Sequence, residues 1–395
     1  MKTITLSDVS VNGRGYYGIG ASAVPFSDDL YTYLRITDIN DDGTLNMADL
    51  KSVDDEKACE YLLQPNDIVF ARTGASTGRN YFYDGSDGKF VYAGFLIKFS
   101  IDPSKINPKY VKYFCLSQQY KDWIRSFNTG STRGNINAQT LGKMPIPELE
   151  REKQDALVEI LSSIDAKIKQ NNAINENLEQ QAQSYFQELF VDNADPEWAI
   201  GTISDLGTVV GGSTPSKAKP EYYTETGIAW ITPKDLSINK SKFVSRGEND
   251  ITELGLKNSS ATIMPEGTVL FSSRAPIGYI AIAAGEVTTN QGFKSVVPKP
   301  EIGTPFVYFF LKNTLPVIEG MASGSTFKEV SGSTMKNVPA VIPDAETLAK
   351  FSDFCAPIFA QQRILEEQNQ SLATLRDNLL PKLMSGEIDV STIQL

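Results

Sequence analysis

Apolar residues recur at alternating intervals of three and four positions in two glycine-free segments, residues 148–190 and 344–380. This heptad spacing predicts two long α-helices, each with one apolar seam. The seam of the first segment consists of Leu157, Leu161, Ile164, Ile168, Asn171, Asn175, Leu178 and Ala182. The seam of the second consists of Leu348, Phe351, Cys355, Ile358, Gln362, Leu365, Asn369, Leu372 and Leu379.

Two such seams in one chain most simply pack on each other. Both contain polar residues, and Asn175 and Asn369 stand at equivalent places. Helices of roughly 35–40 residues are about 50–60 Å long. If the two halves of the chain are related by a two-fold axis, the helices run antiparallel as a coiled coil. The alternative is that each helix only covers the core of its own domain.

The rest of the chain consists of short β-rich runs separated by Gly, Pro, Asn and Asp. Ile68–Phe70 and Val269–Phe271 resemble strands that end in tight turns containing glycine. Residues 110–120 and 306–312 resemble short helices that pack aromatic side chains inward. These runs predict two mixed α/β domains beside the long helices.

The chain contains one internal repeat, in which matched stretches follow in the same order at offsets between 194 and 200 residues. Asp38 corresponds to Asp235 at an offset of 197, and Pro65 corresponds to Pro265 at an offset of 200. Further matches join residues 6–9 to 203–206, 110–114 to 306–310 and 130–132 to 324–326. Small drifts in the offset are what loop insertions produce.

The expected fold class is therefore α+β, with two pseudo-symmetric globular domains separated by two long helices in an antiparallel coiled coil. The expected boundaries are 1–147 for the first domain, 148–190 for the first helix, 191–343 for the second domain, and 344–395 for the second helix and C-terminal tail.

Composition narrows the possible functions. The 395 residues include no histidine, which removes the usual general base near neutral pH, histidine-activated nucleophiles and histidine-ligated zinc. No GxxxxGK[ST] phosphate loop is present either. Three scattered cysteines, and the absence of a signal peptide or a long apolar run, favour a cytoplasmic protein outside the membrane. We therefore expect neither a metal site nor a catalytic centre.

The net charge of −11 lies mostly in the two helical segments. Residues 149–190 and 344–395 each contain eight acidic and four basic residues. The two globular segments are close to neutral, so each could present a basic face to a nucleic acid.

Candidate DNA contacts lie in loops that recur in both halves. Residues 71–79 and 272–278 follow matched strands and combine small residues with arginine, which can bind phosphate or the edge of guanine. The loops at 130–133 and 324–328 combine Ser, Thr and a cation in the same way. The candidate residues are Arg35, Arg72, Thr73, Ser76, Arg79, Arg133, Lys217, Lys219, Lys234, Ser273, Arg274 and Lys328. The alternative for each is a role in a turn or cap, with its charge solvated.

Over essentially its whole length the sequence resembles the specificity (S) subunits of type I restriction-modification enzymes. The resemblance is carried by Trp230–Leu236 (WITPKDL), Gly211–Ser216 (GGSTPS), Leu379–Ile388 (LLPKLMSGEI) and the Pro145–Pro147 start of the first helical segment. The first domain departs more, because Ile36–Ile39 (ITDI) replaces the ITPKDL-like string.

The resemblance implies a non-catalytic subunit with two target-recognition domains, each of which reads one half of a bipartite, asymmetric site in double-stranded DNA. The helices would set the spacer and bind two methyltransferase (M) subunits, and restriction (R) subunits could join the complex. S-adenosylmethionine, ATP and magnesium would be bound by those partners, with no cofactor in this chain.

Two other functions stay open from the residues alone. One is a scaffold that binds protein partners through its coiled coil and never contacts DNA. The other, disfavoured by the missing histidine and nucleotide motifs, is a single-chain enzyme that acts on nucleic acid.

Overall fold

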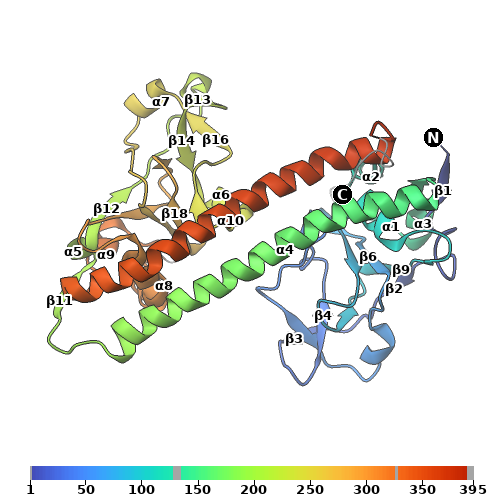
Figure 1. Ribbon diagram of the computed structural model, residues 1–395, viewed down its shortest axis with the longest axis horizontal. Coiled ribbons are helices and arrows are strands. Elements are labelled where there is room, and N and C mark those ends of the chain that lie inside the picture. The colour runs from blue at the N-terminus through green and yellow to red at the C-terminus, as the bar shows by residue number, and fades with distance from the viewer. Residues whose placement is uncertain (1, 128–134, 325–327, 389–395) are drawn as a thin grey trace. The chain divides into compact units, whose positions relative to one another are not determined.

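The computed structural model describes residues 2–127, 135–324 and 328–388. The chain forms two compact units (Figure 1). Unit 1 comprises Met1–Lys167 and Leu372–Leu395, and unit 2 comprises Ile168–Ser371. Each unit therefore contains one globular domain and one half of each long helix.

Unit 1 contains a two-stranded ribbon and two four-stranded sheets. The ribbon pairs β1 (Thr3–Thr5) with β10 (Pro145–Pro147). The first sheet has the order β2 (Tyr16–Tyr17), β9 (Leu96–Ser100), β6 (Asp67–Ala71), β7 (Asn80–Tyr83). The second has the order β3 (Ala23–Pro25), β5 (Lys51–Val53), β4 (Tyr31–Leu34), β8 (Phe90–Tyr92). The helices are α1 (Pro108–Phe114), α2 (Gln118–Arg125) and α3 (Ala138–Gly142), with 3-10 turns at Ala58–Tyr61 and Gly74–Ser76.

Unit 2 contains the same three sheets in a slightly extended form. The ribbon pairs β11 (Ala199–Thr202) with β21 (Pro339–Ile342). One sheet has the order β12 (Gly207–Gly211), β20 (Lys294–Pro298), β17 (Val269–Ser273), β18 (Ile277–Ala283), β15 (Phe243–Val244). The other has the order β13 (Tyr223–Thr224), β16 (Asn249–Ile251), β14 (Ile228–Ile231), β19 (Thr288–Thr289). Its shorter helices are α5 (Ile203–Leu206), α6 (Pro233–Ile238), α7 (Glu253–Lys257), α8 (Thr304–Met321) and α9 (Gly332–Lys336), with a 3-10 turn at Pro220–Tyr222.

Strand order confirms the internal repeat and the expected fold class. The order β2–β9–β6–β7 returns as β12–β20–β17–β18, and β3–β5–β4–β8 returns as β13–β16–β14–β19. Even the single parallel pair of the smaller sheet is kept, as β4 with β8 and as β14 with β19. The two domains are therefore copies of one topology, as the offsets in the sequence predict.

The aspartates that mark the repeat have a structural role in both copies. Asp38 accepts a hydrogen bond from the backbone N–H of Arg35, and Asp235 accepts one from that of Thr232, both at 2.7 Å. At the earlier matched position, Asp8 and Asp205 accept equivalent backbone bonds from the residue three positions before them. A carboxylate at this spacing satisfies a free N–H at the start of a turn or helix.

The two long helices are α4 (Arg151–Gln187), which continues into a short π-helical turn at Glu188–Asp192, and α10 (Ala345–Ser385). α10 continues through Pro357, whose missing N–H costs one hydrogen bond of the helix. Within unit 2 the pairing runs antiparallel, because Asn171 lies 2.9 Å from Asn369 while Phe186 packs against Phe351.

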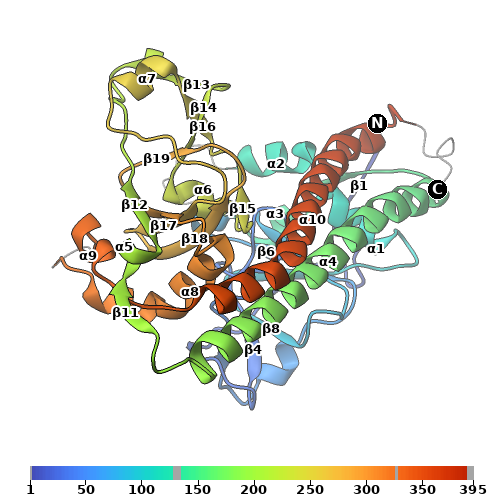
Figure 2. The same cartoon turned by 60° about the vertical axis from the view of Figure 1, so that its left-hand side comes forward.

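All the seam residues that the sequence identifies are buried or half-buried in the helices. Several of them also belong to the domain cores, so the helices, which lie side by side in Figure 1 and Figure 2, pack both on each other and on the domains. In unit 1, Leu157 and Leu161 share a cluster with Leu380 and Leu383 of α10 and with the first sheet. Among the polar seam residues, Asn369 accepts a hydrogen bond from Asn171 and donates one to Asn172.

A buried ionic cluster fastens the domain of unit 2 to the helices. Glu179 of α4 accepts hydrogen bonds from Lys242 at 2.8 Å and from Lys312 of α8 at 2.5 Å. The Lys242 ammonium also lies 3.5 Å from the centroid of the Phe359 ring, and its side chain is 6% exposed. Burial raises the pKa of Glu179, but the two ammonium groups outweigh burial and hold that pKa at about 2.

We expect Glu179→Gln to lower the free energy of unfolding by about 3 kcal/mol at neutral pH, because it leaves Lys242 buried without its counter-charge. The lowered pKa means that the ionised carboxylate stabilises the fold above its ordinary value of 4.5, and that this contribution is lost as the pH falls toward 2. Denaturant titration at pH 7 and pH 3 should therefore show the difference between wild type and variant shrinking in acid. The control is Glu176→Gln, at an exposed position on the same helix; equal effects of the two changes would contradict the proposed role of the cluster.

Candidate nucleic-acid interface

In each unit a glycine lets the chain cross from the larger sheet to the smaller one. A Cβ at Gly18 would lie 2.2 Å from the carbonyl oxygen of Tyr92, and a Cβ at Gly212 would lie 1.9 Å from that of Asn290. Neither position can hold a side chain without moving the backbone. The crossing brings the ends of β2 and β12 close to the turns that precede β9 and β20.

In each half, a residue just after the second candidate loop donates a backbone hydrogen bond to the beginning of the first. The N–H of Ile136, just after the loop at 130–133, donates to the carbonyl of Arg72 at 2.9 Å. The N–H of Val330, just after the loop at 324–328, donates to the carbonyl of Ser273 at 3.0 Å. The structure therefore places the segment after the second loop against the first loop in both units. Arg133 lies outside the described residues.

Five of the candidate cations already have carboxylate partners within their own unit. Arg35 pairs with Asp38 and Asp49, and the other pairs are Arg79 with Asp41, Lys219 with Glu221, Lys234 with Glu248, and Arg274 with Glu329. A cation in such a pair must exchange one anion for another to bind phosphate, so its gain on DNA binding is reduced. These residues are weaker candidates than their sequence context indicates.

Three candidate cations have no carboxylate partner among the described residues, namely Arg72, Lys217 and Lys328. Lys217 and Lys328 are exposed on unit 2. Arg72 is half-buried, and its guanidinium carbon lies 5.2 Å from the centroid of the Tyr17 ring and 5.9 Å from that of Phe95. These three positive charges are available to an anionic ligand.

The hydroxyl candidates differ in exposure. Thr73 and Ser76 are half-buried on the loop after β6, and Thr73 bridges to Asn135. Ser273 is fully buried, and its hydroxyl donates to the carbonyl of Gly292 at 3.1 Å. Ser273 is therefore the weakest of the predicted DNA contacts, because its hydroxyl is buried and has an internal partner.

Reasoning from the sequence missed the aromatic side chains beside Arg72. Tyr17 is 44% exposed and Phe95 is 56% exposed, although both adjoin strands of the larger sheet. Neither lies in a loop rich in Gly, Ser and Thr, and the pattern of the sequence offers no sign that they meet Arg72. The pairing of β2 with β9 places Tyr17 opposite Ile97, two residues from Phe95, and each of the two rings lies near Arg72.

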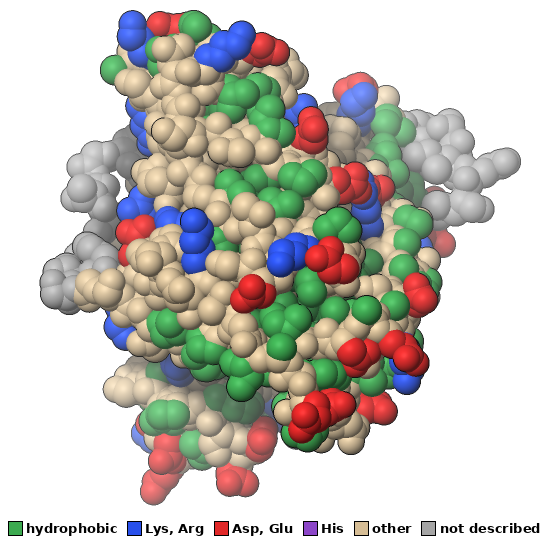
Figure 3. Space-filling view, turned by 90° about the vertical axis from the view of Figure 1, so that its left-hand side faces the viewer, with side chains coloured by type: hydrophobic (Ala, Val, Ile, Leu, Met, Phe, Trp, Pro, Cys, Tyr) green, Lys and Arg blue, Asp and Glu red, His purple; other side chains and the backbone are tan. Residues whose placement is uncertain are grey.

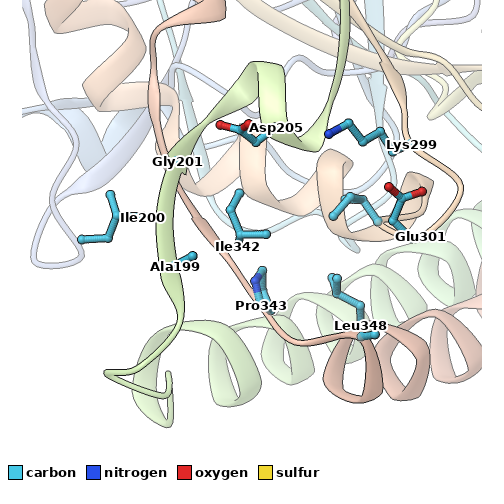
Figure 4. Close-up of a pocket in the computed structure, with 11 residues that line it drawn as sticks. Ala199, Ile200, Gly201, Asp205, Lys299, Glu301, Ile342, Pro343 and Leu348 are labelled. Carbon is cyan, nitrogen blue, oxygen red and sulfur yellow. The ribbon is translucent and has the colours of Figure 1, made fainter.

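Two grooves lie beside the β11–β21 ribbon of unit 2. One, of about 370 Å³, is apolar and is lined by residues that include Phe186, Trp198 and Phe310. The other, of about 440 Å³, contains Asp205, Lys299 and Glu301 (Figure 4). Ile200 lines both grooves and is 85% exposed, and apolar side chains gather between scattered charges on this face (Figure 3). A partly apolar surface of this kind suits a protein partner.

The described part of the chain contains neither a metal-binding cluster nor a membrane-spanning helix. No cluster of three or more acidic or cysteine side chains there could hold a metal ion. None of its helices is both long enough and apolar enough to cross a membrane.

A family of known proteins matches most of the chain. The model of the "Type I restriction modification DNA specificity domain" matches residues 28–180 and again 196–375. The chain is 40% identical over 191 residues to the type I restriction enzyme MjaIX specificity subunit of Methanocaldococcus jannaschii, a match that spans 46% of this chain and 44% of the relative. It is 21% identical to the HindI specificity subunit of Haemophilus influenzae, over 91% of this chain and 96% of the relative.

A solved structure has the same fold. The S subunit of a type I restriction-modification system from M. genitalium aligns with 97% of this chain and 95% of its own, at 18% identity and a TM-score of 0.56.

We expect Lys217→Ala and Lys328→Ala each to weaken duplex binding and to lower the slope of log affinity against log salt by about one, because each would remove one phosphate contact. Titration of a fluorescent duplex at several salt concentrations measures both quantities. Lys257→Ala is the control, since Lys257 is also exposed on unit 2 but pairs with Glu253. Slopes that stay at the wild-type value in both variants would exclude these lysines from the interface.

Proposed function

Because this chain belongs to the type I restriction modification DNA specificity family, we propose that it selects the DNA sequence on which a methyltransferase and nuclease complex acts. Unit 1 would read one half of a bipartite site and unit 2 the other. The chain itself would carry no catalytic step. The scaffold alternative is not favoured, since the family match covers both globular domains as well as the helices.

The observation that carries the proposal is one topology built twice with different loop side chains. Both copies join the loop after the buried strand to the segment after the second loop, through Arg72 in unit 1 and Ser273 in unit 2. Equal frameworks with unequal side chains should bind two different half-sites. The full site would then be asymmetric.

We assign the chemistry and much of the non-specific attraction to partner subunits. Two methyltransferase subunits would dock on the helices and on the apolar groove beside Ile200, and restriction subunits could join them. S-adenosylmethionine, ATP and magnesium would be held by those partners. The low net charge of the domains supports this division, because a chain at −11 overall needs help to attract phosphate. The thiols of Cys115 and Cys355 are free and buried, which suits the cytoplasm.

We expect exchange of residues 1–145 for those of another family member to change one half-site and leave the other intact, because those residues supply the recognition loops of unit 1 alone. Genome-wide mapping of methylated bases, in cells that express the chimera with the methyltransferase partner, provides the measurement. The control is the reciprocal exchange of residues 191–343, which should change only the other half. Alteration of both halves by either exchange would contradict independent reading.

We expect the number of unread base pairs between the half-sites to depend on helix length. Four residues inserted after Asn172 in α4 and four after Glu367, at the opposing level of α10, lengthen each helix by about 6 Å. The spacer should grow by roughly one or two base pairs at 3.4 Å per step.

The same methylation mapping tests this prediction. An insertion of four residues after Gly285, in an open turn, serves as the control and should leave the spacer unchanged. A spacer that keeps its length in the helix variant would show that the helices do not set it.

A further inference from the structure

Equivalent backbone hydrogen bonds show which residues of the two domains correspond to each other around the candidate loops. Ile19 donates to Tyr92 as Ser213 donates to Thr289, and Leu96 donates to Ala93 as Phe293 donates to Asn290. Two constant offsets follow, 194 for the crossing segment and 197 for the turn before β9 or β20. By these offsets Tyr17 corresponds to Gly211, and Phe95 corresponds to Gly292.

The backbone hydrogen bonds at the ends of β6 and β17 complete this correspondence between the two domains. Arg72 donates its N–H to Phe95 and accepts from Ile136, whereas Ser273 donates its N–H to Gly292 and accepts from Val330. Arg72 therefore corresponds to Ser273. Three neighbouring positions hold Tyr17, Arg72 and Phe95 in unit 1, while Gly211, Ser273 and Gly292 occupy them in unit 2. The same framework carries large side chains in one domain and almost none in the other.

In unit 1, the Tyr17 and Phe95 rings restrain the side chain of Arg72. The Arg72 guanidinium is near both the Tyr17 and the Phe95 ring, and the backbone of Arg72 is fixed by two hydrogen bonds. Tyr17 is fixed in turn, since its hydroxyl accepts from the N–H of Ala138 at 3.2 Å. The Nε atom of Arg72 is buried and has no hydrogen-bond partner among the described residues.

The chemistry of this arrangement favours a base over a phosphate. A phosphate contact needs only a positive charge, which a flexible lysine supplies equally well. Two exposed aromatic rings that restrict one arginine orient its planar fork and reduce the entropy lost on binding. An oriented fork matches the O6 and N7 atoms of guanine, the commonest specific contact in the major groove.

We propose that Arg72, held between Tyr17 and Phe95, reads a guanine in the half-site of unit 1, a contact that unit 2 cannot make. This inference rests on the proposed DNA-recognition function and names one base contact within it. Tyr17 and Phe95 are positioning residues, and Arg72 determines specificity.

Arg72→Ser provides the sharpest test, because the equivalent position of unit 2 already carries serine on the same backbone. The complex of the full chain with its methyltransferase subunit is used with wild type, R72S and R72K. Methylated bases are mapped, and affinities are measured for duplexes in which each base pair of the site is changed in turn. We expect R72S to lose the preference for one guanine of the first half-site by roughly 10- to 100-fold and to leave the second half-site unchanged.

R72K keeps the charge but not the fork, so it should lose most of the same preference while its salt slope stays near that of the wild type. Phe95→Leu should weaken that preference in part without moving it to another base. Lys89→Ser, which removes an exposed charge elsewhere in unit 1, serves as the matched control and should change neither quantity.

Three experimental outcomes would contradict this inference, and they can be distinguished from one another. A wild-type complex that shows no bipartite site overturns the proposed function and this inference with it. A normal bipartite site whose first half is unchanged by R72S and R72K overturns this inference alone. An equal loss by R72S on every duplex, with a lower salt slope and full rescue by R72K, would make Arg72 a phosphate contact and would also overturn it.

Discussion

Each domain core is completed by side chains from both long helices. In unit 1, Leu380, Leu383 and Met384 of α10 belong to the same cluster as the first sheet. In unit 2, Ala182 and Phe186 of α4, and Phe190 of the π-helical turn that follows it, pack with the core of the second domain. Burial of such side chains contributes about 1.5–3 kcal/mol each. The core of unit 1 therefore cannot form from one contiguous segment, whereas that of unit 2 lies within Ile168–Ser371. In both units, half of each long helix must be in place before the domain is complete.

This constraint explains why the helices are fastened to the domains by polar contacts as well as apolar ones. In unit 1, Asp165 of α4 accepts hydrogen bonds from Lys112 and Tyr113 of α1 and from Arg376 of α10. In unit 2, Glu179 takes the corresponding role with Lys242 and Lys312. The two anions stand at different points of α4, so each domain is fixed to the helix pair by its own set of contacts. A cluster of hydrogen-bonded charges allows fewer orientations than an apolar contact, so it restricts how each domain packs on its own part of the helices.

The helices and the repeat could be predicted from the sequence because both depend on periodicity. Heptad spacing identified the seam, and matched strings such as Pro65 with Pro265 identified the duplication. The partner of Asn369 could not be predicted, because the heptad pattern gives which face is buried but not the axial alignment of two antiparallel helices. The sequence predicted that the first long helix begins at residue 148, whereas α4 begins at Arg151. Helix ends are commonly uncertain by a few residues.

The candidate site was less predictable, because whether a side chain is free to bind DNA depends on contacts within the protein that the sequence does not show. Arg79 and Arg72 stand in the same loop, yet only Arg79 meets a carboxylate, Asp41, from a segment 38 residues earlier. Ser273 resembled an exposed loop hydroxyl, but it is the last residue of β17, in which every residue is buried. Sequence offsets alone pair Arg72 with position 272, and only the hydrogen bonds show that Ser273 is its counterpart.

The backbone contacts shared by the two domains determine which positions of such a protein can vary. The backbone hydrogen bonds at the ends of β6 and β17 involve only N–H and carbonyl groups. They therefore form with either Arg72 or Ser273 at one position, and with either Phe95 or Gly292 at the other. Gly18 and Gly212 are excluded from this freedom, because the close carbonyl oxygens leave no room for a side chain. The framework therefore separates positions that must stay small from neighbours that can change freely. A duplicated domain built in this way can acquire two different reading surfaces without any change in how its chain is folded.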